Sequence, residues 1–122
     1  MDKAQSIHYF WSMFGLPAYD ENSVPDDATM PYITYSVSTG SIDNFVLLSA
    51  SLWYRSTSWA SISRKADEIE SVITGMNPST IKIDGGRVYL VKGNPFAQRM
   101  SEPGDSMTRR IYLQINAEFL TN

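Results

Sequence analysis

The 122-residue sequence contains no cysteine and only one histidine. Without cysteine the chain can form neither a disulfide framework nor a thiolate metal site. His8 is a lone histidine with no triad partner near it in the sequence, and none of the serines lies in a nucleophile-elbow pattern. We therefore predict that the protein is not an enzyme and that it uses no cofactor and no bound metal.

The sequence also lacks long apolar runs and an excess of positive charge. No apolar run is long enough for a membrane span or for the core of a signal peptide, so we expect a soluble protein made in a cytoplasm. Charged residues make up 19% of the chain and give a net charge of −3, which argues against a sequence-independent grip on nucleic acid phosphates. The length predicts a single domain over residues 1–122.

Hydrophobic periodicity predicts two helices, over residues 3–14 and 58–74. Gly15 and Pro17 end the first helix, and serine and threonine hydroxyls at 56–58 are available to cap the second. The first helix is apolar on more than one side. It could pack on its own sheet, or in part on a neighbouring subunit. The apolar stripes are Ile7, Phe10, Trp11 and Phe14 in the first helix, and Trp59, Ile62, Ala66, Ile69 and Ile73 in the second.

Alternation of apolar and polar residues predicts strands at 32–38, 45–55 and 108–120, with a hairpin at 80–91. Long loops are expected at 15–31 and 93–106, where proline and glycine are frequent. The predicted fold class is α+β, with one mainly antiparallel sheet of about five strands covered by one long helix. With the N-terminal helix, the order of elements is α-β-β-α-β-β-β.

The hairpin can adopt two registers. With Gly85-Gly86 as the turn, Asp84 faces Arg87; with Asp84-Gly85 as the turn, Lys82 faces Arg87. Like charges directly opposite each other are unfavourable, so the first register is predicted.

The second face of the predicted sheet is polar, almost uncharged and rich in aromatic residues. Such a composition is typical of a protein-contact surface, although the first helix could cover part of it. The residues predicted on this face are Tyr32, Thr34, Ser36, Ser49, Ser51, Trp53, Tyr89, Tyr112, Gln114 and Asn116.

With this order of elements the chain resembles the small tail terminator, or tail completion, proteins of long-tailed bacteriophages. The resemblance extends over nearly the whole chain and is one of pattern, without a short motif of active residues. The matching segments are Leu16–Asn22, Pro31–Tyr35, the helix end Ala66–Ile69, the Ile83–Gly86 hairpin and Arg110–Leu113.

The resemblance implies a virion protein of the tail or neck that assembles as a hexameric ring. The ring would cap the tail tube, end its polymerisation and offer the surface to which the filled head attaches. Its implied partners are further copies of itself, the tail tube protein and a head–tail connector or stopper protein. Viral DNA would pass through the lumen without sequence-specific binding, and no membrane is involved. The alternatives are a head–tail stopper or adaptor or a minor capsid protein of the same region and, more remotely, an unrelated binding module or small enzyme.

We expect the loops 15–31 and 93–106 and the second sheet face to meet other subunits or the tail tube. The predicted interface residues are Trp11, Tyr19, Asp26, Asp27, Tyr32, Trp53, Tyr89, Phe96, Arg99, Met100 and Tyr112.

Overall fold

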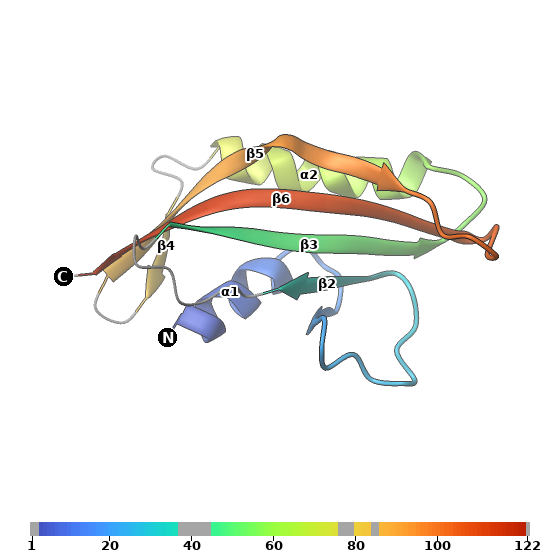
Figure 1. Cartoon of the computed structure of the whole chain (residues 1–122), viewed down its shortest axis with the longest axis horizontal. Coiled ribbons are helices and arrows are strands. Elements are labelled where there is room, and N and C mark those ends of the chain that lie inside the picture. The colour runs from blue at the N-terminus through green and yellow to red at the C-terminus, as the bar shows by residue number, and fades with distance from the viewer. Residues whose placement is uncertain (1–2, 37–44, 76–79, 84–85, 122) are drawn as a thin grey trace.

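The computed structural model describes residues 3–36, 45–75, 80–83 and 86–121 and confirms the α+β class (Figure 1). The predicted strand end at 37–38, the loop 39–44 and residues 84–85 of the predicted hairpin lie outside the described residues. The elements in chain order are α1 (Lys3–Ser12), β1 (Ala18–Asp20), β2 (Tyr32–Ser36), β3 (Phe45–Arg55), α2 (Ala60–Gly75), β4 (Thr80–Ile83), β5 (Gly86–Met100) and β6 (Thr108–Thr121).

The strands form one sheet in the order β1-β2-β3-β6-β5-β4. Its centre is the long antiparallel pair β3–β6, which is joined over the whole length of β3. β1 is a strand that the sequence did not predict. It lies inside the expected loop 15–31 and pairs parallel to β2, with Ala18 beside Ile33. The sheet therefore has six strands instead of about five, and its β1–β2 pair is parallel.

The expected loop 93–106 is wrong over its first half, because β5 continues to Met100. Lys92 pairs with Ile115 and Ala97 pairs with Leu113, so four residues of β5 lie opposite Gln114 alone. This wide bulge contains the cis Asn94–Pro95 bond, and bulges are where a strand accommodates proline and glycine. Gly93 is required by crowding, since a Cβ there would lie 2.8 Å from the Cβ of Gln114.

The predicted hairpin register is also wrong. Lys82 pairs with Arg87 and Ile83 pairs with Gly86, which is the alternative of the two registers. At the level of sequence, this register uses the dipeptide Asp-Gly, which two-residue hairpin turns prefer. The Arg87 side chain is exposed, and like charges in water repel each other by only about 1 kcal/mol. The turn preference therefore outweighs the charge argument.

A single hydrophobic core lies between the two helices and one face of the sheet, as Figure 1 shows for α2 lying along β5 and β6. The core contains the expected apolar stripe of the first helix and, from α2, Ile62, Ala66, Ile69 and Ile73. Trp59, expected in the second stripe, precedes α2 and is only partly buried against the core. The amide of Ala60 donates to Ser58 Oγ at 3.0 Å, so Ser58 caps α2. The side of each strand predicted to face the core does so wherever its side chains are described.

Helix α1 packs on the same face of the sheet as α2. His8 Nδ1 lies 2.8 Å from the hydroxyl of Tyr35, a core-facing residue of β2, and Lys65 of α2 donates to the carbonyl of Phe14 at 2.8 Å. α1 contacts β1 at one edge of the sheet and β4 at the other. The sheet therefore curves around α1, and neither helix covers the opposite face.

Candidate assembly surfaces

We call the sheet face opposite the helices the open face. Residues paired directly across strands point to the same side, so the register defines its members. Among the side chains that the structure describes, the charged members are Arg55, Arg87, Arg110 and Glu118; they stand near strand ends, and the rows between them are uncharged. The uncharged described members are Tyr19, Tyr32, Thr34, Ser36, Ser49, Ser51, Trp53, Thr80, Tyr89, Val91, Gln98, Met100, Thr108, Tyr112, Gln114 and Asn116.

A row of aromatic rings crosses the open face from its β1 edge. Tyr19 and Tyr32 have ring centroids 5.8 Å apart, and Tyr32 and Trp53 have theirs 6.4 Å apart. The guanidinium of Arg110 continues the row 4.8 Å above the Trp53 ring. Aromatic pairs of this kind contribute about 0.5–1.5 kcal/mol each beyond the area they bury.

Hydrogen bonds fix this row in place. Trp53 Nε1 donates to Thr34 Oγ1 at 2.9 Å, and Arg110 Nε donates to Ser51 Oγ at 3.0 Å. Arg110 also lies 3.4 Å from a carboxylate oxygen of Glu102. The rings are thus held before any partner arrives, which lowers the entropy that a contact would cost.

Six of the predicted interface residues lie on the open face: Tyr19, Tyr32, Trp53, Tyr89, Met100 and Tyr112. Asp26 and Asp27 are exposed in the loop between β1 and β2. Arg99 is exposed on the helix-bearing side of β5.

Two predicted interface residues need correction. Trp11 is 0% exposed and Phe96 is 7% exposed, so both side chains belong to the core of the subunit and are unavailable to a partner. Trp11 packs with Phe10 and Phe14 on the sheet side of α1. Phe96 lies in the bulge of β5 and is buried there. Its burial was not predicted, because residues 93–106 were expected to form an exposed loop.

Several surface residues of interest were missed. Arg110 was not among the predicted interface residues, and its place beside Trp53 follows only from the β3–β6 register. Val91 is 60% exposed on the open face, and the exposed Gln98 shares that face because β5 extends beyond the bulge. The second apolar side that was predicted for the first helix is exposed on α1, at Tyr9 and Met13.

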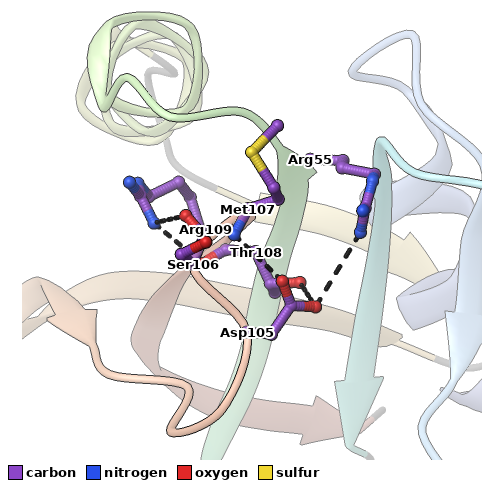
Figure 2. Close-up of polar contacts among 6 residues, drawn as sticks. All are labelled: Arg55, Asp105, Ser106, Met107, Thr108 and Arg109. Carbon is purple, nitrogen blue, oxygen red and sulfur yellow. Dashed lines mark hydrogen bonds and ion pairs between the residues drawn. The ribbon is translucent and has the colours of Figure 1, made fainter.

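A second feature is a tryptophan contacted by two arginines on the helix-bearing side. The guanidinium carbons of Arg99 and Arg109 lie 4.8 and 5.4 Å from the Trp59 ring. Arg109 also donates to the carbonyls of Thr57 at 2.9 Å and Ser106 at 3.0 Å, the latter drawn in Figure 2. The bond to Thr57 connects the start of β6 to the segment that leads into α2.

Asp105 organises the turn between β5 and β6 (Figure 2). Its carboxylate accepts hydrogen bonds from the Thr108 hydroxyl at 2.6 Å and the Met107 amide at 2.9 Å, and Arg55 lies 3.8 Å away. The Thr108 bond, followed by the Met107 bond and the charge of Arg55, lowers the pKa of Asp105. The turn is therefore held by an ionised carboxylate.

Asp20 lies on the helix-bearing side of β1, opposite Tyr35 in the register. Burial raises the pKa of the Tyr35 hydroxyl, and the nearby Asp20 carboxylate raises it further. Among the described residues, no group of three or more histidine and carboxylate side chains is placed to hold a metal ion. No helix in the described part of the chain has the length and apolar character to cross a membrane.

Comparison with known proteins gives a likeness of fold. No family model matches the sequence, and neither does any curated protein. A chain in the solved structure titled "Virion of native gene transfer agent (GTA) particle" superposes with a TM-score of 0.60 and 15% sequence identity. The match covers 90% of this chain and 83% of that chain. At this identity the likeness shows a common fold.

Proposed function

We propose that the protein is a structural virion protein that caps a phage tail tube as a ring of six copies, the number that its resemblance to tail terminators implies. In this role it ends tail polymerisation and forms the surface to which the head attaches. The observation that carries the proposal is the open face, which is aromatic, pre-ordered and uncharged over its middle, and which neither helix covers.

The fold supports this proposal, since the solved chain that it resembles belongs to the virion of a gene transfer agent particle. The surface chemistry supports it as well. Charge depletion and aromatic enrichment distinguish contact surfaces from freely solvated ones. A ring is built from heterologous contacts between different patches of one subunit, and this subunit carries distinct patches on its open face, on α1 and around Trp59.

The proposed partners are further copies of the chain, the tail tube protein and a connector or stopper protein of the neck. DNA would pass through the ring lumen without sequence-specific binding. The net charge of −3 suits this passage because it gives no general attraction for phosphates. The chemistry proposed for the protein is that of assembly, without an enzymatic step.

The test uses purified protein and purified tail tubes. We expect a ring-sized mass on one end of each tube, and tubes that stop growing when the protein is present during assembly. The Trp53→Lys variant should lose capping, whereas Ser71→Lys, which places the same charge on the exposed side of α2, should retain it. Binding to the portal complex without any binding to tubes would overturn the proposal in favour of a stopper or adaptor.

A further inference from the structure

The end of β1 and the loop that follows it carry a set of carboxylates with no cationic partner among the described residues. Asp20, Glu21, Asp26 and Asp27 lie within eight consecutive residues, and none of them forms an ion pair with another described residue. Asp20 accepts a hydrogen bond from the amide of Asn22 at 2.9 Å, which shapes the start of the loop. We call residues 20–27 the acidic loop.

The complementary charge lies around Trp59. Arg99 and Arg109 both contact its ring, and neither forms an ion pair with a described carboxylate. Arg109 Nε is buried without a hydrogen-bond partner among the described residues. Arg99 is exposed, so its guanidinium can accept a carboxylate while it remains stacked on Trp59. We call Trp59, Arg99 and Arg109 the arginine cluster.

Strand β1, which leads into the acidic loop, lies at the level of the arginine cluster but at the opposite edge of the sheet, and Asp20 is two residues along β1 from the row of Arg99. One cross-strand row runs Ala18, Ile33, Leu52, Ile111 and Arg99. At about 4.8 Å per strand, four steps separate the two ends of this row by ~19 Å. Strands β2, β3 and β6 stand between them, so the loop of one copy does not reach the arginines of the same copy.

Both ends of this row also have a free strand edge. β1 has β2 on one side and no described strand on the other. β4 pairs only with Gly86–Tyr89, so the outer edge of β5 near Arg99 has no strand partner among the described residues. Asp20 and Arg99 both lie on the helix-bearing side of the sheet. A second copy set beside the first in the same orientation would bring these two edges together.

We propose that the acidic loop of one copy docks on the arginine cluster of the next copy in a head-to-tail contact. The contact is heterologous, because it joins two different patches of the same chain, and it repeats from copy to copy. Opposite charges fix its direction and register. The inference rests on the proposed ring and names one of its subunit contacts.

The first test exchanges the charges of the two patches. The Asp26→Lys/Asp27→Lys variant places cations opposite Arg99, and the Arg99→Glu variant places an anion opposite the acidic loop. Each variant alone should associate at least about tenfold more weakly than the wild type, as measured by sedimentation velocity at low salt. An equimolar mixture should assemble again, because alternating copies restore opposite charges at every contact. Failure of the mixture to recover association, with both variants folded by circular dichroism, would overturn the proposal.

The second test exploits the absence of cysteine from the chain. Asp27→Cys and Arg99→Cys variants are mixed under mild oxidation at high protein concentration. A disulfide-linked dimer should form in the mixture far faster than in either variant alone. Equal cross-linking of Asp27→Cys with itself would show a symmetric contact, and no cross-linking in the mixture would show that the patches do not meet. Either result would overturn the proposed contact.

The outcomes for the contact and for the proposed function can be told apart. If the charge-reversed variants cap tail tubes as well as the wild type, the ring remains and this contact is wrong. If the wild type forms the cross-link but caps no tube, the contact remains and the proposed function is wrong.

Discussion

At the scale of single residues, a few side chains hold the irregular parts of the chain. Asp105 closes the turn between β5 and β6, and Thr108, whose hydroxyl it binds at 2.6 Å, is itself buried. Gly93 allows the β5 bulge to lie against Gln114. Both residues lie where regular strand pairing stops. Replacing Asp105 should change the pH dependence of stability, and replacing Gly93 should lower stability by crowding.

We predict that Asp105→Asn changes the acid sensitivity of the protein. The pKa of Asp105 is lowered in the fold, so its ionised form stabilises the folded state above the unfolded value of about 3.9. This contribution is lost as the pH falls through the lowered folded pKa. The melting temperature of the wild type should therefore drop more between pH 5 and pH 3 than that of Asp105→Asn. Parallel melting curves for the two proteins would contradict this role.

We predict that Gly93→Ala destabilises the fold by about 1–3 kcal/mol, because the new Cβ would overlap Gln114. Gly75→Ala is the matched control. Nothing lies within 4 Å of a Cβ at that position, so this change should be neutral or slightly stabilising. Urea denaturation measures both effects, and equal stabilities for the two variants would show that the bulge can relax.

At the scale of elements, β3 has two faces with different surroundings. Leu52 points into the core and is 0% exposed, whereas its neighbour Trp53 lies in the aromatic row of the open face. Because side chains alternate along the strand, a core residue stands next to a residue of the proposed assembly surface.

We predict opposite results from the same substitution at these neighbouring positions. Leu52→Lys buries a charge in the core and should cost about 4 kcal/mol or more, so the domain should not fold. Trp53→Lys loses ring contacts and one hydrogen bond and should cost about 1–2 kcal/mol, leaving a folded protein that fails to assemble. Circular dichroism and sedimentation velocity distinguish the two; an unfolded Trp53→Lys would contradict the assignment of the open face.

At the scale of the whole molecule, α1 connects parts of the sheet that are far apart in strand order. It contacts β1 and β4 at the two edges, and its residues Ile7, Phe10, Trp11 and Phe14 join the same core as those of α2. One sheet and one core suggest that the described parts of the chain unfold together.

We predict that Trp11→Ala lowers the stability of the whole chain by about 3–5 kcal/mol in a single transition. Trp11→Phe should cost less, because a ring still fills the site and the indole N–H, which has no described hydrogen-bond partner, is removed. Thermal unfolding followed by near- and far-ultraviolet circular dichroism measures both variants. Two separate transitions would contradict the prediction of a single domain.

The sequence predicted the regular parts of the fold well because their patterns are local. The stripe from Ile62 to Ile73 and the alternation from Ile111 to Ala117 each identify one buried face without reference to the rest of the chain. The polar, aromatic face follows from the same alternation, so most of its members were predicted. The interface assignments themselves remain predictions.

Long-range pairing alone decided the remaining features. β1 is three residues long and exists because β2 lies beside it, and β5 continues through Gly93 and Pro95 because β6 offers hydrogen bonds beyond the bulge. Trp11 and Phe96 have the composition of contact residues, but tertiary packing buries them. The sequence by itself thus determined which strand faces are apolar and which are polar, since side-chain periodicity is a local property. Only the tertiary structure decided that both helices cover one face and leave the other open, because that depends on contacts between residues distant in the chain.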